Sequence, residues 1–356
     1  MHRNNAAETT MPVVAFPQCV AKTYARDGGA IVPGRHVPNH CRIVGEVARA
    51  LLKRWPTALA ASLFPPGSAL AAACHDIGKV SPTFQEKLRR ACTADIEDWP
   101  ILPVNPALEK MWGGHAGVSQ LAARAVGAPR YVPEILGEHH GFSPPVAGKR
   151  ATDEAFGGAA WQAQRAALVE DLKSQLHVDW PQVESAAQAR LLAGLTSVAD
   201  WIGSGRFFEN PTEPWQDKIE RAIDDAGFIA PVYRAGLCFA NAFGFAPRAV
   251  QQTFIDTVTS PGVYVLEAPM GVGKTEAALF AAYHLLVAQR ATGIYFALPT
   301  QLTSNKIHER FNAFLSTILA PDCRHRAWLL HSKAWLIDTE MGEEGRPGGA
   351  WFNQAK

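Results

Sequence analysis

Residues 70–79 of the chain read Leu-Ala-Ala-Ala-Cys-His-Asp-Ile-Gly-Lys. The run of small apolar residues predicts a buried helix, which ends in the adjacent pair His75 and Asp76. An imidazole beside a carboxylate suits a divalent transition metal. The alternative is a buried His-Asp pair that is only hydrogen-bonded, and these two residues alone do not decide between the two readings.

Composition limits the class of protein. The 356 residues favour two domains, and a hydrophobic content of 47% is enough for sizeable cores. A net charge of +1 argues against a basic coat for nucleic acid, so any such contact depends on local patches. The six cysteines form no CxxC motif, which indicates a reducing compartment. The sequence shows neither a signal peptide nor a long apolar run, and we expect a cytoplasmic protein with no membrane contact.

Helical spacing of apolar residues dominates the first two thirds of the sequence. After an irregular lead-in over residues 1–35, a helix capped by Asn39 places His40 in its first turn. A second helix, within residues 58–73, is interrupted by Pro65-Pro66-Gly67 and leads to His75. We find no strand-like alternation before about residue 230. The pattern predicts an all-α domain over residues 36–235.

The remaining candidate ligands also stand at helix ends or inside apolar helices. His115 follows a glycine turn, His139 and His140 close a short helix, and Asp200 lies within a strongly apolar helix. Burying a carboxylate there costs several kcal/mol unless it is paired or binds a metal. Any one of these histidines alone fits a structural role, with its ring bonded to a carbonyl. Together they favour convergence on one site, made of His40, His75, Asp76, His115, His139, His140 and Asp200.

Seven ligands exceed the needs of one tetrahedral zinc and fit two octahedral ions that share Asp76. Such a pair activates water and stabilises the attacking and leaving oxygens at phosphorus, which predicts phosphodiester hydrolysis. Asp76 is the central catalytic candidate. Lys79, one turn beyond His75, is a candidate for neutralising the phosphate, or else a solvated lysine. Ser204 is a weaker candidate for a hydrogen bond at the same place.

These motifs resemble a known superfamily. His40, His75-Asp76 and Asp200 match the H...HD...D pattern of the HD phosphohydrolases, which are all-α proteins. Gly-Gly-His at 113–115, His-His-Gly at 139–141 and Ala-Asp-Trp at 199–201 resemble the nuclease domain of the CRISPR-associated helicase-nucleases of type I systems. The resemblance implies metal ligands at the same seven positions and two ions of Mn, Fe, Ni or Co. It also implies single-stranded DNA as substrate and an RNA-guided surveillance complex (Cascade) as partner.

The helical pattern of the sequence ends near residues 225–245, and a second motif follows. Residues 268–275 read Ala-Pro-Met-Gly-Val-Gly-Lys-Thr, a Walker A loop between an expected strand at 263–266 and a helix at 276–287. Another strand is expected at 294–298. The loop amides, with Gly271 and Gly273, would bind the β-phosphate of ATP, Lys274 would reach the β- and γ-phosphates, and Thr275 would hold Mg²⁺. A P-loop kinase or a transporter ATPase is the alternative.

The loop resembles that of superfamily 2 helicases, whose adenine-reading glutamine would correspond to Gln251. Thr300 and Thr303 resemble the motif that touches the DNA backbone in that family. A Walker B acid would stand in an apolar strand that ends in Asp-Glu, and no such strand follows in the sequence. The acidic residues that do follow lie in a polar stretch: Asp338, Glu340, Glu343 and Glu344. We therefore expect a truncated helicase, residues 236–356 being the start of a RecA-like lobe, with negligible ATPase activity.

The predicted fold is mainly α: an all-α HD domain followed by the start of an α/β RecA-like P-loop domain. The predicted protein is a monomeric single-stranded DNA nuclease whose full-length form is also an ATP-dependent helicase in type I CRISPR interference. Two alternatives stay open. One is an HD phosphohydrolase of small nucleotides, and the other is a catalytically silent scaffold that binds nucleic acid.

Overall fold

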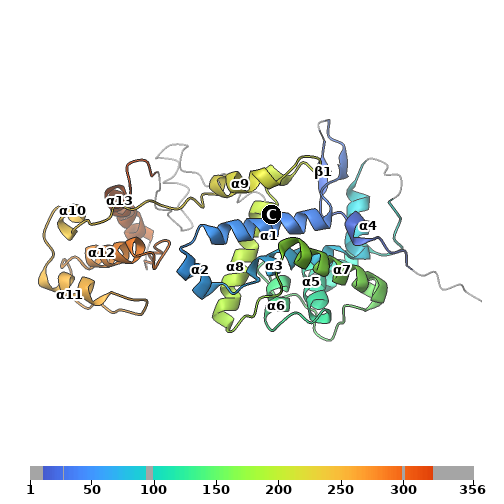
Figure 1. The fold of residues 1–356 in the computed structure, drawn as a ribbon, viewed down its shortest axis with the longest axis horizontal. Coiled ribbons are helices and arrows are strands. Elements are labelled where there is room, and N and C mark those ends of the chain that lie inside the picture. Colours follow the sequence, from blue (N-terminus) through green and yellow to red (C-terminus); the bar gives the residue numbers. More distant parts are fainter. Residues whose placement is uncertain (1–10, 27, 94–98, 299–300, 324–356) are drawn as a thin grey trace, which may run out of the picture. The chain divides into compact units, whose positions relative to one another are not determined.

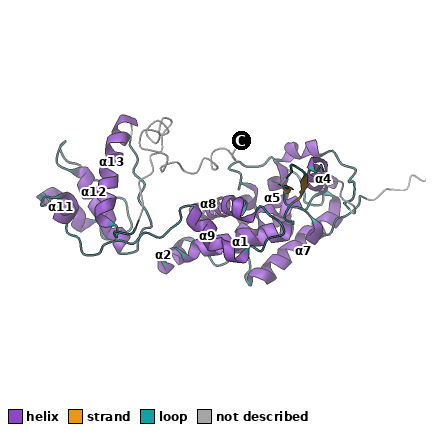
Figure 2. Ribbon diagram, turned by 90° about the horizontal axis from the view of Figure 1, so that it is seen from above, coloured by secondary structure: helices purple, strands orange, loops and turns teal. Residues whose placement is uncertain are grey.

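The computed structural model describes residues 11–26, 28–93, 99–298 and 301–323, with the side chains of 301–306 excepted. The chain divides into two compact units, Met1–Ile229 and Ala230–Lys356 (Figure 1). Each unit is described by itself below. Helices make up most of the described chain (Figure 2).

The first unit is an assembly of helices with one short hairpin. Between the third and fourth helices lies a 3₁₀ segment, Cys74–Lys79, which contains the His-Asp pair. The helices are α1 (Val37–Lys53), α2 (Thr57–Leu63), α3 (Ser68–Ala73), α4 (Pro82–Ala91), α5 (Gly114–Ala125), α6 (Val132–Gly137), α7 (Gly158–Leu176), α8 (Ala186–Gly203) and α9 (Ile219–Asp225).

Helix α1 begins three residues earlier than the sequence suggested. His36, in extended conformation, is the N-cap, and Asn39 lies within the first turn, so the predicted cap at Asn39 is wrong. Pro38 is accepted there because the first N–H groups of a helix have no intrahelical partner. The amide of His40 donates to the carbonyl of His36 at 3.1 Å, which closes the first turn and leaves the His40 side chain buried.

The helical run before the His-Asp pair breaks where predicted, at the Pro65-Pro66-Gly67 turn between α2 and α3. Gly67 has a φ of 93°, which side-chain-bearing residues rarely adopt. A second irregularity falls at Asp76, whose φ of −108° and ψ of 17° lie outside the helical region. The helix is thus interrupted at the residue on which the candidate site is centred.

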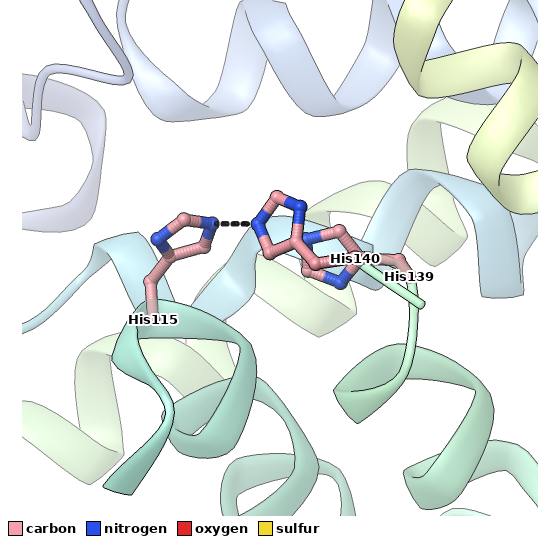
Figure 3. Close-up of side chains that lie close together, drawn as sticks. All are labelled: His115, His139 and His140. Atoms are coloured by element: carbon pink, nitrogen blue, oxygen red, sulfur yellow. Dashed lines mark hydrogen bonds between the residues drawn. The ribbon is translucent and has the colours of Figure 1, made fainter. Parts of the chain in front are cut away.

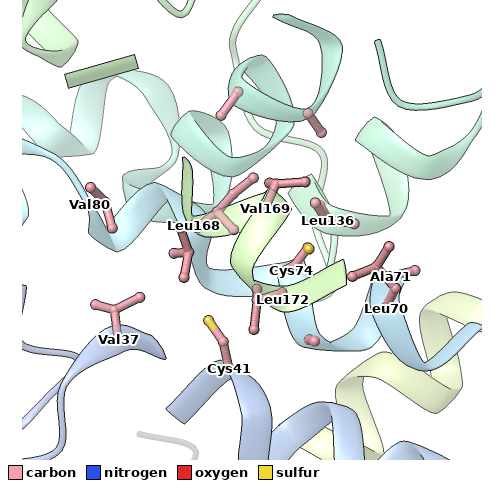
Figure 4. Packing of buried hydrophobic residues seen from close by; sticks show 14 of the residues in the cluster. Val37, Cys41, Leu70, Ala71, Cys74, Val80, Leu136, Leu168, Val169 and Leu172 are labelled. Carbon is pink, nitrogen blue, oxygen red and sulfur yellow. The ribbon is translucent and has the colours of Figure 1, made fainter. Parts of the chain in front are cut away.

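A core of small and branched side chains holds these segments together (Figure 4). Cys41 of α1, Leu70 of α3, Leu136 of α6 and Leu172 of α7 are all fully buried or nearly so and belong to one hydrophobic cluster. Helix α1 also packs on α3 and α8. A Cβ placed on Gly45 would lie 2.9 Å from the Cβ of Ala73, so the close approach of α1 and α3 requires glycine.

The 3₁₀ segment is also packed closely against α5. A Cβ on Gly78 would come within 2.0 Å of the carbonyl oxygen of His115 and 2.5 Å of the Ser119 amide nitrogen. The Gly78 amide instead donates to Ser119 Oγ at 2.9 Å. This contact fixes the start of α5, and therefore His115, beside the His-Asp pair.

The N-terminal lead-in is more ordered than its sequence suggested. Strands β1 (Thr23–Ala25) and β2 (Ile31–Pro33) form an antiparallel pair. The amide of Val20, which is buried, donates to Gln85 Oε1 of α4 at 2.9 Å. Strands of three residues are too short to show an alternating pattern, which is why the sequence read as irregular.

The described part of the second unit is helical. Phe239, Phe280 and Phe314 are buried in its core. Its helices are α10 (Phe239–Phe243), α11 (Ala249–Thr257), α12 (Lys274–Val287) and α13 (Gln301–Ile318). Helix α12 includes the helix predicted after the Walker A loop.

The two strands predicted in this unit, at 263–266 and 294–298, are not formed in the structure. Val263, Val265 and Tyr295 are 96%, 79% and 85% exposed. Apolar β-branched residues favour a strand only where a neighbouring strand pairs with it and buries its faces, and two isolated strands are marginal. The described residues offer these segments no such partner.

Candidate metal centre

The structure brings together all seven of the candidate ligands in the first unit. They come from the start of α1, the 3₁₀ segment, the start of α5, the turn after α6 and the end of α8. Their nitrogen and oxygen atoms form two groups, each within 4.8 Å. One group contains His40, His75, Asp76 and Asp200, and the other contains His115, His139 and His140.

The first group surrounds one oxygen of Asp76. His40 Nε2 lies 2.9 Å and His75 Nε2 lies 3.1 Å from Asp76 Oδ2. Asp200 Oδ1 is 3.2 Å from the same His75 nitrogen and 3.7 Å from His40 Nε2. Two imidazoles and two carboxylates therefore converge on one small volume.

The second group faces the other oxygen of Asp76. His115 Nε2 lies 3.1 Å and His139 Nε2 lies 3.6 Å from Asp76 Oδ1. His140 Nε2 is 3.1 Å from His115 Nε2, and the three imidazoles lie close together (Figure 3). Asp76 thus stands between the groups with one oxygen directed to each.

Backbone carbonyls set the orientation of two rings. His75 Nδ1 lies 2.8 Å from the Ala72 oxygen, and His139 Nδ1 lies 2.7 Å from the Leu136 oxygen. With the proton on Nδ1, each Nε2 is left as an inward-facing acceptor, the arrangement found in metal-binding histidines. Ser204 Oγ donates to Asp200 Oδ1 at 2.9 Å and steadies that carboxylate.

The donor set fits a divalent cation. His75 Nε2, His139 Nε2 and Asp76 Oδ1 are buried and have no hydrogen-bond partner of acceptable geometry. Burying a polar atom without a partner costs free energy, so such atoms in a folded protein call for an explanation. A bound transition-metal ion, which takes nitrogen and carboxylate oxygen ligands, would satisfy all three atoms.

Burial and neighbouring charges set the protonation of the centre. Burial raises the pKa of Asp76, but His75 and Lys79 outweigh it and hold that pKa well below its usual range. Burial also raises the pKa of Asp200, and His75 again more than reverses this. Burial lowers the pKa of His40 to about 4. Both carboxylates are therefore ionised near neutral pH, and His40 is neutral, as metal ligands must be.

His75 is the exception among the ligands. Burial lowers its pKa, but the carboxylates of Asp76 and Asp200 outweigh burial and raise it to about 10. Without a metal, His75 therefore carries the proton that compensates these two acids. A bound cation would have to displace that proton.

Lys79 contributes a positive charge directly beside the centre. Its Nζ lies 2.6 Å from Asp76 Oδ2 and 5.5 Å from the ring centre of Phe84. Lys22 is a second, unpredicted cation: its Nζ donates to the Ser204 carbonyl at 3.2 Å, at the end of α8. No sequence signal indicated Lys22, because it lies in a segment without a recognisable motif.

The Walker A loop occupies the expected place before α12. Gly271 and Gly273 have φ values of 79° and 90°, which the loop requires of glycine. Lys274 Nζ donates to the carbonyl oxygens of Ala268 at 2.6 Å and Pro269 at 3.2 Å. Thr275 is the second residue of the helix.

Gln251 is buried against this loop. Its Nε2 donates to the carbonyl oxygen of Gly273 at 2.9 Å, and its Oε1 accepts from the amide of Arg248 at 2.8 Å. The side chain is thus occupied by protein partners in this structure. Thr300 and the acidic residues Asp338, Glu340, Glu343 and Glu344 lie outside the described residues, as does the side chain of Thr303.

Residues 21–208, more than half of the chain, match the family model described as Cas3, HD domain. The chain belongs to the Cas3 HD domain family. This match confirms the family resemblance drawn from the sequence motifs. The match and the curated relatives, which are named as nuclease/helicases, support an enzyme of the hydrolase class.

Two curated Cas3 proteins resemble the chain over most of its length. The CRISPR-associated nuclease/helicase Cas3 of Streptococcus thermophilus is 27% identical over an alignment of 313 residues that covers 74% of this chain and 33% of that protein. The endonuclease/helicase Cas3 of Thermus thermophilus is 29% identical over an alignment of 332 residues that covers 79% of this chain and 35% of that one. The chain thus spans about a third of these relatives.

The fold resembles that of solved Cas3 structures. T. fusca Cas3 with ATP superimposes with a TM-score of 0.69 at 22% identity, covering 94% of this chain and 42% of that one. A CRISPR-associated protein gives a TM-score of 0.62 at 26% identity, covering 86% of this chain and 37% of that one. The likeness confirms the predicted fold class, an all-α Cas3 HD domain followed by the start of a helicase domain.

None of the helices in the described part of the chain is by itself long and apolar enough to cross a membrane. Two of them, Thr57–Leu63 and Ser68–Lys79, pass such a test only when joined across a bend of 64°.

Proposed function

We propose that the first unit is a metal-dependent nuclease that hydrolyses phosphodiester bonds of single-stranded DNA. The observation that carries the proposal is the position of Asp76, whose two oxygens face two separate groups of ligands. A bridging carboxylate of this kind suits two ions held close together, the arrangement typical of phosphodiester hydrolysis.

The ligands divide naturally between two ions. His40, His75 and Asp200 with Asp76 Oδ2 would hold one, and His115, His139 and His140 with Asp76 Oδ1 would hold the other. Mixed nitrogen and oxygen ligands favour Mn, Fe, Ni or Co over Ca or Mg. When bound, such ions supply activation of water and neutralisation of charge at phosphorus.

The protein contributes position, charge and exclusion of water. Asp76 and His75 are 2% and 0% exposed, so the electrostatic interactions of the centre are only weakly screened. Lys79, beside Asp76, supplies a positive charge for a non-bridging phosphate oxygen. Ser204 holds Asp200, and the carbonyls of Ala72 and Leu136 hold two of the rings, so the ligands need little reorganisation.

We infer a wider role by analogy with the curated relatives, of which this chain spans about a third. We propose that Gly271, Gly273, Lys274 and Thr275 bind the phosphates and Mg²⁺ of ATP, and that Gln251 supports this site. The full-length helicase would then feed a DNA strand to the nuclease in type I CRISPR interference, after recruitment by the surveillance complex Cascade. The names of the curated relatives, CRISPR-associated nuclease/helicases, support this reading. A monomer in the cytoplasm is the proposed form.

A cleavage assay tests the nuclease. The 356-residue chain with Mn²⁺ should degrade single-stranded DNA, and EDTA or the substitution Asp76→Ala should abolish cleavage, while Asp217→Asn, at an exposed site, should not. Hydrolysis of dNTPs or cyclic dinucleotides with DNA left intact would favour the small-nucleotide phosphohydrolase. An absence of both bound metal and cleavage would leave the scaffold reading.

A further inference from the structure

Phe142 lies at the exposed edge of the proposed metal centre. Its side chain is 51% exposed, and its ring lies 17° from parallel to that of His140, with the ring centres 6.5 Å apart. Single exposed apolar residues are common and need no explanation by themselves. This ring differs because it lies against a candidate metal ligand.

A row of ring contacts connects Phe142 with the positive charge of the site. His140 lies 5.1 Å from His115, and His115 lies 5.2 Å from Phe84, measured between ring centres. The ammonium of Lys79 lies over the far ring, Phe84, at 5.5 Å. Phe84 is only 5% exposed, so of the two phenylalanines in this row Phe142 is the one open to a flat ligand.

The turn that carries Phe142 is held in place. Gly141 has a φ of 85°, and its amide donates to the carbonyl oxygen of Glu138 at 2.7 Å. The hydroxyl of Ser143 donates to the carboxylate of Glu138. The residues on both sides of Phe142 are thus tied to Glu138, so that binding a ligand would cost little entropy for ordering the turn.

We propose that Phe142 is a base-stacking platform that positions a single-stranded nucleic acid for cleavage at the metal centre. The inference rests on the proposed nuclease function and adds a substrate-contacting residue to it. A base stacked on the exposed face of Phe142 would leave the sugar-phosphate backbone to follow the imidazoles toward Lys79 and the two ligand groups. Stacking on aromatic rings tolerates any base, so this contact would hold a strand without reading its sequence.

Binding without cleavage gives the first test. A single-stranded oligonucleotide containing 2-aminopurine, whose fluorescence falls on stacking, is titrated with the full chain in EDTA. Phe142→Leu should raise the dissociation constant about 5- to 150-fold, the range expected for one lost stacking contact, and abolish the quenching. Phe142→Trp should restore both. Phe228→Leu is the matched control, because Phe228 is 39% exposed and precedes the end of the first unit by one residue.

An abasic strand gives the second test. The wild-type chain and Phe142→Leu should bind it with the same affinity, because it has no base to stack. If Phe142→Leu bound the 2-aminopurine strand and quenched its fluorescence as the wild type does, the stacking role of Phe142 would be refuted, while the proposed nuclease function would still stand. If the wild-type chain with Mn²⁺ neither binds nor cleaves DNA, the proposed function itself fails, and the platform fails with it.

Discussion

Replacing Asp200 by Ala removes a carboxylate that belongs to one ligand group only. Asp200 Oδ1 lies 3.2 Å from His75 Nε2, whereas His115 and His139 of the other group lie beside Asp76 Oδ1. If each group binds one ion, Asp200→Ala should lower the metal stoichiometry from two to one. Asp76→Asn, which changes the carboxylate shared by both groups, should weaken both ions.

The size of the effect follows from linkage. Substituting a residue that only orients a ligand costs about 10- to 100-fold in metal affinity, so losing a ligand should cost at least about 100-fold. At a free metal concentration of 100 times the dissociation constant, each ion stabilises the fold by about 2.7 kcal/mol. For a unit of 229 residues this corresponds to a Tm increase of roughly 5–11 °C per ion.

Metal analysis after gel filtration gives the stoichiometry, and thermal denaturation with and without Mn²⁺ gives the stabilisation. The wild type should show the full increase in Tm, Asp200→Ala about half of it, and Asp76→Asn almost none. The exposed Asp217→Asn should match the wild type. If Asp200→Ala lost both ions, or still bound two, the division of the ligands into two groups would be refuted.

Three further predictions follow from the structure. The pKa of His75 is raised to about 10 from about 6.5 in the unfolded chain, so protonated His75 stabilises the metal-free fold fully below pH 6.5, and this stabilisation is lost as the pH rises toward 10. The affinity for Mn²⁺ should instead increase with pH, because the metal displaces the His75 proton. Thermal melting in EDTA measures the first trend, and Mn²⁺ titration at several pH values measures the second. Gly78→Ala should destabilise the first unit by about 1–3 kcal/mol and weaken metal binding, whereas Gly194→Ala, in open space on α8, should stabilise it by about 0.5–1 kcal/mol, as urea denaturation would show. Lys274→Ala should abolish binding of a fluorescent ATP analogue and leave metal-dependent DNA cleavage by this chain unchanged. If the variant still bound the ATP analogue, the prediction would be wrong.

Helix positions near the site could be predicted because local signals agree there. The Pro65-Pro66-Gly67 turn between α2 and α3 and the glycines before His115 all mark element boundaries through their backbone preferences. The same signals misplaced the start of α1 by three residues, since a proline is compatible with the first turn as well as with the position before it.

Long-range contacts could not be predicted from spacing alone. Which oxygen of Asp76 faces which histidines depends on how α1, α5 and α8 pack, and that depends on the close approach at Gly78 and Gly45. Lys22 and Phe142 had no motif to distinguish them, because their positions matter only once the chain has folded. The strands expected at 263–266 and 294–298 failed for a related reason, since strand formation requires a partner that local sequence does not specify.

The most direct test of the two-ion account is a crystal structure of the chain with Mn²⁺, analysed by anomalous difference density at the manganese edge. Binding of two ions should give two peaks, one on each side of the Asp76 carboxylate, the first among His40, His75 and Asp200 and the second among His115, His139 and His140. A single peak, or two peaks that Asp76 does not bridge, would contradict it.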